Sequence, residues 1–468
     1  MGRRRLVAVT AGLAVLAAVP LAAGPSLRVA SGFASSTLCS GAFVSGLNPD
    51  RVYAETVRPT PGFGWVDPVL RYEVDRARDE VRTTIGGAFA RRAVYRAGLG
   101  CLLVYAELPA FLASTELATD PSTPPLMPEI AGPEVVVPAS ERLRGALDHA
   151  FDEPGGQPRR LTKAVVVVHD GHVVAERYAP GYGVSTQLPG NSATKSVTSA
   201  LIGVLARQGR ITVSGPAPVA AWRDPKDPRS AITIAQLLRM TAGFPSDELH
   251  GAVDDSVRMW FLATDMAAMA EGATLATSPG SRWAYSDSSY EVLARILRDA
   301  VGGDVGDELR FSHRELFDPL DMRSVTFQVD ATGTFTGSKG MFASARDWAR
   351  FGLLYLDDGV AGGVRILPEG WVRMTTSPML DTGYGAGFWL NVVSTPMPQW
   401  GLSWGMPGAP PDTFFAFGYL GQYVVVVPSE RLVIARFGIT HAMGGDGRGI
   451  GQLVADLVTD VIAAIHAP

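Results

Sequence analysis

The sequence predicts an α/β fold of the α+β type, with one antiparallel sheet flanked by helices and a mainly helical subdomain. Two features indicate this fold. Strand-like segments gather at both ends of the region after residue 139, and the stretch between them, about 196–350, has helical periodicity. A single sheet assembled from both ends would unite these strands. The expected elements are a helix from about 140 to 151, strands at 164–168, 172–178, 422–427 and 432–437, and a helix at about 449–465.

The first two strands form a predicted hairpin. Asp170-Gly171 lies between them, and this dipeptide favours the tight turns that join antiparallel strands. His169 and His172 flank the turn, but two histidines without a carboxylate or a third ligand do not make a metal site. We therefore expect no metal, and no other cofactor.

The N-terminus has the pattern of an export signal or a membrane anchor. Three arginines at 3–5 precede an uncharged apolar run at 6–23, which is just long enough to cross a bilayer. We assign residues 1–30 to this segment. The remainder is expected outside the cytoplasmic membrane, either released into a periplasmic or other extracytoplasmic space or held at the membrane by the anchor.

Three further regions follow the signal. Residues 31–118 form an expected accessory region, 119–138 a Pro-rich linker, and 139–468 the main domain. Within the accessory region, the charged stretch 70–81 is predicted to be a helix and 100–105 a buried strand. The length of 468 residues supports this division, because it exceeds that of one ordinary domain.

The composition excludes some partners and leaves the cysteine state open. The formal net charge is −5 and no long basic run follows the N-terminus, so nucleic acid is not an expected partner. Cys39 and Cys101 are the two cysteines, and both precede the main domain. They fit either a disulfide or two buried thiols, and an oxidising compartment favours the disulfide.

The strongest candidate for chemistry is Ser192-Ala193-Thr194-Lys195. A polar, turn-like segment precedes Ser192, and apolar residues at helical spacing follow it, so Ser192 lies at or near the start of a buried helix. The Ser and Lys then share one helix face, about one turn apart. A hydroxyl, a neighbouring amine and the free N–H groups of a helix start are components of an acyl-transfer site.

A second candidate motif, Tyr285-Ser286-Asp287, lies in a turn-rich loop before a predicted helix. A Tyr beside an ammonium group can act as a general base. Asp287 has two interpretations that the sequence does not separate: its carboxylate pairs with Lys195, or it caps the following helix.

The order of three motifs resembles the serine β-lactamase and penicillin-binding-protein-like hydrolases. These motifs are the Ser-x-x-Lys at 192–195, Pro279-Gly280 with Tyr285-Ser286-Asp287, and Gly-x-x-Gly-Gln at 418–422. The resemblance covers about 140–460 and is strongest to the class C β-lactamase-like branch with esterases, amidases and 6-aminohexanoate-dimer hydrolases. It implies a β-lactamase-like fold and a serine hydrolase domain at 139–468.

The resemblance also implies roles for individual residues. Ser192 would be the acylated nucleophile, with Lys195 and Tyr285 sharing the proton transfers. The backbone N–H groups of Ser192 and Gln422 would form the oxyanion hole. We expect the substrate to contact these residues: Asp287, Tyr419, Gly421, Tyr384 and Trp389.

One departure from the family pattern bears on the substrate. Members that bind β-lactams carry a Lys-Thr-Gly or His-x-Gly triplet, where we align Tyr419-Leu420-Gly421. A cation that would hold a β-lactam carboxylate is therefore missing. This favours a small, uncharged ester or amide as substrate. The alternatives are a β-lactamase or D-Ala-D-Ala peptidase, and a non-catalytic envelope binding or sensor protein.

A rival nucleophile occurs in Gly401-Leu402-Ser403-Trp404-Gly405, which matches the Gly-x-Ser-x-Gly elbow of α/β-hydrolases. That elbow needs a helix immediately after the serine. The following segment, 406–411, is rich in Pro and Gly and does not continue as a helix. We interpret this match as a chance occurrence in a loop.

Overall fold

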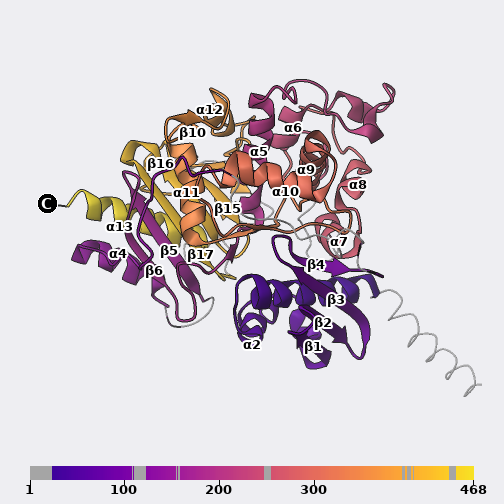
Figure 1. The fold of residues 1–468 in the computed structure, drawn as a ribbon, viewed down its shortest axis with the longest axis horizontal. Helices are drawn as coiled ribbons and strands as arrows, with labels where there is room; N and C mark the ends of the chain where they lie inside the picture. The colour runs from indigo at the N-terminus through magenta and orange to yellow at the C-terminus, as the bar shows by residue number, and fades with distance from the viewer. Residues whose placement is uncertain are drawn as a thin grey trace, which may run out of the picture.

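The computed structural model describes residues 24–107, 109, 123–153, 155, 159–246, 254–392, 396–397, 402–403, 405–441 and 449–467 (Figure 1). The apolar run expected to act as a signal or anchor, 6–23, lies outside these residues. Within the described ranges, every helix is too short or too polar to cross a bilayer.

A six-stranded antiparallel sheet forms the centre of the main domain and confirms the predicted assembly from both ends of the chain. Its spatial order is β12-β15-β16-β17-β5-β6. The two strands from the start of the domain are β5 (Thr162–His169) and β6 (His172–Tyr178). The four from its end are β12 (Trp389–Leu390), β15 (Phe414–Gly418), β16 (Gln422–Val427) and β17 (Leu432–Gly438).

Three helices cover this sheet. The predicted first and last helices, α4 (Glu141–Phe151) and α13 (Ile450–Ile465), pack against each other beside β5 (Figure 1). Helix α11 (Ala345–Leu356) packs on β16, β17 and β5, and it comes close because Gly352 has no side chain to hold it away from Val424 and Val433. The sheet is therefore almost entirely buried, as its valine-rich strands require.

The helical subdomain lies between the two groups of strands in sequence, as predicted. Its helices are α5 (Thr194–Arg207), α6 (Ile234–Leu238), α7 (Asp255–Leu262), α8 (Met266–Glu271), α9 (Asp287–Val301) and α10 (Val305–Ser312). The remaining elements of the main domain are short, each of five residues or fewer. They are α12 (Trp371–Thr375), β7 (Leu188–Pro189), β8 (Thr326–Phe327), β9 (Met341–Ala343), β10 (Val360–Ala361), β11 (Val364–Arg365), β13 (Pro396–Met397) and β14 (Leu402–Ser403).

The accessory region forms a compact unit beside the main domain, drawn in indigo in Figure 1. A helix over 24–39 and α2 (Pro49–Val52) accompany a four-stranded antiparallel sheet, ordered β1-β2-β3-β4. Its strands are β1 (Leu70–Asp75), β2 (Glu80–Ile85), β3 (Ala88–Arg96) and β4 (Gly100–Val104). The predicted strand at 100–105 is confirmed by β4.

The predicted helix at 70–81 is wrong, because this stretch forms β1, a turn and the start of β2. Leu70, Tyr72 and Val74 alternate with charged residues, which places them together on one face of a strand.

The expected signal boundary at residue 30 falls inside the helix over 24–39. There Ser31 Oγ lies 2.8 Å from Thr83 Oγ1 on β2.

A disulfide joins Cys39, at the end of the first helix, to Cys101 on β4, with 6.0 Å between the Cα atoms. This confirms the expected pairing.

The Pro-rich segment, described from residue 123, packs on the main domain rather than forming a free linker. Its Met127 and Ile130 are buried there, and the Ile130 carbonyl accepts a hydrogen bond from the N–H of Val173 on β6.

Candidate active site

Ser192 lies on a tight turn at the start of α5, which confirms its predicted position before a buried helix. The preceding residue, Asn191, has φ = 46°, in the left-handed region that Asn adopts more readily than most residues. Its side-chain Nδ2 donates to the carbonyl of Tyr419 at 2.8 Å. Gly190 is required here because a Cβ would overlap the ring of Trp348. The turn is thus held by the hydrogen bond from Asn191 to Tyr419 and by the packing of Gly190 against Trp348.

Gly418, the last residue of β15, packs directly on this turn. A Cβ at Gly418 would overlap the carbonyl of Gly190 and would lie 3.1 Å from the Ser192 nitrogen. Only glycine allows this approach. The strand end that faces the nucleophile turn is therefore Ala416-Phe417-Gly418, followed by Tyr419.

This placement corrects the sequence alignment of the third motif by three residues. Gly421, assigned there to the substrate site, faces Arg436 and Ile450 instead. Gln422 begins β16, and its buried side-chain Nε2 donates to the carbonyls of Tyr419 and Gly438 at 3.0 and 2.7 Å. The alignment failed because two glycines flank one short turn, Gly418 at the end of β15 and Gly421 before β16, and only the backbone approach at Gly418 distinguishes them.

Lys195 is almost completely buried and points back toward Ser192. Its Nζ donates to Ser192 Oγ at 3.0 Å, to Asp287 Oδ1 at 2.5 Å and to the Ser338 carbonyl at 3.0 Å. A lysine ammonium has three N–H donors, enough to serve each of these three acceptors. The arrangement fits a charged Lys195 that positions the hydroxyl of Ser192.

Asp287 resolves the alternative that the sequence left open. It forms a buried ion pair with Lys195, in which the two side chains are 0% and 2% exposed. The cap of helix α9 is the preceding residue, Ser286, whose hydroxyl accepts the N–H of Ser289. Asp287 therefore pairs with the lysine rather than capping the helix.

Tyr285 also lies next to the lysine. The centre of its ring is 4.8 Å from Lys195 Nζ. Trp389 stacks on this ring with a 5.9 Å centroid separation, and Tyr384 meets it edge-on at 6.4 Å. Trp283 completes the cluster. Because Tyr384 and Trp389 are 1% and 3% exposed, they shape and hold the position of Tyr285 more than they offer open surface to a substrate.

The sequence analysis missed two residues that help to hold Lys195 in place, Ser338 and Glu291. Ser338, whose carbonyl accepts from Lys195, donates its hydroxyl and its N–H to one oxygen of Glu291 at 2.6 and 3.2 Å. Glu291 lies one helical turn after Asp287 on α9, and burial raises its pKa to about 8. The spacing of Asp287 and Glu291 on one helix face was a signal available in the sequence.

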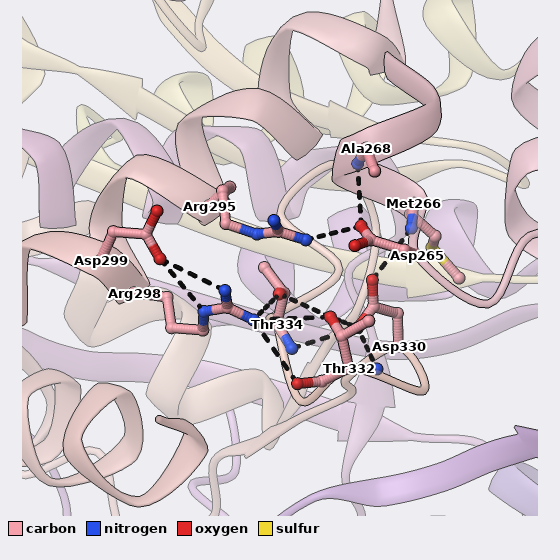
Figure 2. Close-up of polar contacts among 9 residues, drawn as sticks. All are labelled: Asp265, Met266, Ala268, Arg295, Arg298, Asp299, Asp330, Thr332 and Thr334. Atoms are coloured by element: carbon pink, nitrogen blue, oxygen red, sulfur yellow. Dashed lines mark hydrogen bonds and ion pairs between the residues drawn. The ribbon is translucent and has the colours of Figure 1, made fainter. Parts of the chain in front are cut away.

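A network of polar contacts joins helix α9, which carries Asp287 and Glu291, to α8 and to the loop before Ser338 (Figure 2). Arg295 on α9 pairs with Asp265 at the start of α8 at 2.5 Å. Asp330 accepts the N–H of Met266 at 2.9 Å and holds the 330–334 loop through Thr332. The network thus links α8, α9 and the loop that leads to Ser338.

Comparison with known families identifies the domain. The family model described as Beta-lactamase matches residues 147–457, which is most of the chain. The chain belongs to the Beta-lactamase family. It is accordingly a serine hydrolase, and its architecture confirms the predicted β-lactamase-like fold.

Two curated relatives of this Beta-lactamase family member have named activities. The 6-aminohexanoate-dimer hydrolase of Paenarthrobacter ureafaciens is 24% identical over 74% of this chain and 87% of its own. The D-alanyl-D-alanine-carboxypeptidase/endopeptidase AmpH of Escherichia coli (strain K12) is 28% identical over 68% and 89%. A solved penicillin-binding protein homologue from Caulobacter crescentus has a TM-score of 0.52 and 16% identity, covering 71% of this chain and 100% of its own, and supports the fold.

The rival elbow does not have the structure that an α/β-hydrolase needs. Ser403 lies in the two-residue strand β14, and residues 405–413 form turns rather than a helix. The side chains of 401–404 lie outside the described residues. Among the side chains that are described, no three His, Cys, Asp or Glu residues gather as metal ligands would.

Proposed function

We propose that this protein is an exported serine hydrolase that cleaves ester or amide bonds of small molecules through an acyl-enzyme on Ser192. One observation carries the proposal: Lys195 Nζ lies 3.0 Å from Ser192 Oγ and 4.8 Å from the ring centre of Tyr285. An alcohol, an amine and a phenol from separate parts of the chain thus meet at the start of one helix. Such a cluster is the requirement for nucleophilic acyl transfer.

The contacts suggest how the three groups divide the work. Ser192 Oγ forms the bond to the acyl carbon, and the bond from that carbon to the leaving group breaks. A lysine ammonium has no lone pair, so while Lys195 is charged it cannot accept the proton of Ser192. We therefore assign the base to Tyr285, since a neighbouring cation favours the ionised phenol in general. Tyr285 passes the proton to the leaving group, and then activates the water that releases the acid.

The developing negative charge on the substrate carbonyl needs two donors. The N–H of Ser192, at the start of α5, is one of them. We propose that the second is on the Gly418–Tyr419 segment instead of Gln422, because Gly418 is the residue that lies against the Ser192 nitrogen. Each such donor contributes about 3 kcal/mol to stabilisation of the transition state.

Export remains part of the proposal on two grounds. The arginines at 3–5 followed by the apolar run at 6–23 have the pattern of an export signal or anchor. The disulfide between Cys39 and Cys101 is of the kind that persists in oxidising compartments. A protein held at or released from the cytoplasmic membrane would meet small extracellular or periplasmic substrates.

A peptidase or β-lactamase is the second candidate, favoured by the likeness to the carboxypeptidase AmpH. The strand end that faces Ser192 argues against it. Ala416, Phe417 and Gly418 include no cation to hold the carboxylate that penicillins and D-Ala-D-Ala peptides carry. A non-catalytic binding protein would have no need for the buried Lys195–Asp287 pair beside an accessible serine.

Turnover of three substrate classes tests the proposal. We expect wild-type protein to hydrolyse short 4-nitrophenyl esters or anilides, and to turn over nitrocefin and D-Ala-D-Ala peptides at least tenfold more slowly. Tyr285→Phe should lower kcat by about 10²-fold or more. Rapid nitrocefin turnover with inert esters would favour the second candidate, and no turnover in any class would favour a binding protein.

A further inference from the structure

A pocket of about 160 Å³ lies between the accessory unit and the main domain. The accessory unit supplies one wall, from the helix over 24–39 and the segment that follows it. The main domain supplies the other wall, from the turn before Ser192, the Tyr419–Gln422 turn and the end of β17. The apolar residues that line it are Phe33, Leu47, Val52, Leu188, Pro189, Phe261, Phe342, Leu420 and Ile439.

This pocket is adjacent to the nucleophile. Asn191, the residue before Ser192, and Tyr419, which follows Gly418, both line it. These two residues are hydrogen-bonded to each other at 2.8 Å. The pocket therefore lies beside the turn that holds Ser192, next to the residue that precedes the nucleophile.

The proton path determines which part of the substrate would enter. The leaving group must receive a proton, so it has to lie next to Tyr285 and Lys195. Tyr285 is surrounded by Trp283, Tyr384 and Trp389, and none of these four aromatic residues lines the pocket. The pocket is on the side of Ser192 that carries Asn191 and Tyr419, where the acyl part of the substrate remains.

We infer that the accessory unit completes an acyl-binding pocket, so that the enzyme prefers esters or amides of short apolar acids over acetyl derivatives. This inference rests on the proposed function. A cavity of about 150 Å³ with apolar walls accommodates benzene. A pocket of similar size would hold the hydrocarbon part of a butanoyl to hexanoyl group.

The two lysines that line the pocket do not call for an anionic ligand. Lys163 pairs with Glu55 at 2.8 Å and lies 5.5 Å from the ring centre of Tyr182. Lys339 lies over the rings of Trp260 and Phe261, 4.4 and 4.5 Å from their centres. Both lysines thus already have partners, and although polar residues also line the pocket its surface is mainly apolar, so burial of hydrocarbon is the main source of affinity.

Direct contacts between the accessory unit and the main domain hold the two walls of the pocket together. Gln328 donates to Ser40 Oγ at 2.9 Å and to the Cys101 carbonyl at 3.3 Å, and so joins the main domain to both ends of the disulfide. On the same interface, Phe33 meets Phe261 of α7 edge-on at 5.8 Å. A fixed shape of this kind is needed for selection by chain length.

A series of 4-nitrophenyl esters, from acetyl to octanoyl, tests the inference. In the wild type, kcat/KM should rise by about fourfold per methylene until the pocket is full, and fall for the longest chains. Thr37→Phe and Leu47→Trp place bulk in the pocket from two different elements. Each should lower the ratio of kcat/KM for hexanoyl over acetyl ester at least tenfold.

Ala77→Phe is the matched control, because it adds the same ring at an exposed turn of the accessory sheet. Its chain-length ratio should equal that of the wild type. If all variants fold and the ratio is unchanged in both pocket variants, the acyl pocket is wrong while the hydrolase stands. If a carboxylate-ended acyl chain is preferred over hexanoyl, the apolar ligand is wrong. If Ser192→Ala retains full ester turnover, the proposed function itself fails.

Discussion

Two buried lysines occupy different regions of this protein in similar surroundings. Lys195, in the active site, pairs with Asp287 at 2.5 Å and lies 4.8 Å from the ring centre of Tyr285. Lys163, at the border with the accessory unit, pairs with Glu55 at 2.8 Å and lies 5.5 Å from the ring centre of Tyr182. Each lies beside one carboxylate and at least one tyrosine ring, and Lys195 has a second ring, that of Tyr290, at 5.9 Å.

The two lysines differ in their access to a hydroxyl group and in the burial of their carboxylate partners. Lys195 also donates to Ser192 Oγ, which a substrate can reach, and its carboxylate is completely buried. Lys163 lies on β5, and its partner Glu55 keeps 20% of its side-chain surface exposed. Burial lowers the pKa of Lys163, and the ion pair with Glu55 opposes this shift. A buried lysine pair alone therefore does not indicate catalysis, and the adjacent hydroxyl at a helix start does.

The largest difference between the two regions should come from removing the carboxylate in the active site. Asp287→Asn leaves a buried ammonium without its charged partner, which costs about 3 kcal/mol of unfolding free energy. Because Lys195 then no longer holds Ser192 and Tyr285 in place, kcat/KM for an acetyl ester should fall by about 10²-fold or more.

Urea unfolding and ester kinetics measure both effects in the same preparation. Asp381→Asn, at an exposed position, is the matched control and should change neither quantity. Turnover by Asp287→Asn within twofold of wild type would show that the pair does not serve the reaction.

A second effect, dependent on pH, is expected at Glu291. Its pKa is raised from 4.5 to about 8 by burial, so the folded protein binds a proton that the unfolded chain releases between these values. Stability from this group is complete below pH 4.5 and falls as the pH rises toward 8. Glu291→Gln, which still accepts from Ser338, removes this loss.

Urea unfolding of wild type and Glu291→Gln at pH 5, 7 and 9 checks the sign. The variant should gain a few kcal/mol relative to wild type between the lowest and highest pH. Parallel pH dependences of the two proteins would mean that Glu291 is not protonated in the folded state.

The smallest effect is expected at the border between the two regions. Glu55→Gln should cost about 1 kcal/mol of unfolding free energy, because the exposed part of this pair is already compensated by water. Acetyl ester turnover should remain within twofold of wild type. Glu73→Gln, an exposed carboxylate on β1, is the control and should be neutral. A loss of activity at Glu55 comparable to that at Asp287 would remove the distinction between the two lysines.

Much of the main domain was predictable from the sequence because its signals are local. Valine-rich strands, a turn dipeptide at Asp170-Gly171 and the polar-to-apolar change after Ser192 each indicate one element. The convergence of Ser192, Lys195 and Tyr285 followed from the family resemblance, and the structure confirms that they lie together.

The remaining features depend on contacts between distant segments. Gly418 could not be separated from Gly421 without knowing which backbone touches Ser192. Ser338 supports Lys195 through its carbonyl, which leaves no trace in the residue type. In the accessory unit, the many charges of 70–81 suggested a solvent-exposed helix, whereas the alternation of Leu70, Tyr72 and Val74 was the correct signal.

The most direct test of the account is the mass of the protein after brief reaction with a reactive acyl donor. Wild-type protein mixed with 4-nitrophenyl hexanoate and quenched in acid should carry one acyl group, on the peptide that contains Ser192. Ser192→Ala should carry none. An adduct on the peptide with Ser403, or an equal adduct in Ser192→Ala, would contradict the assignment of Ser192 as the nucleophile.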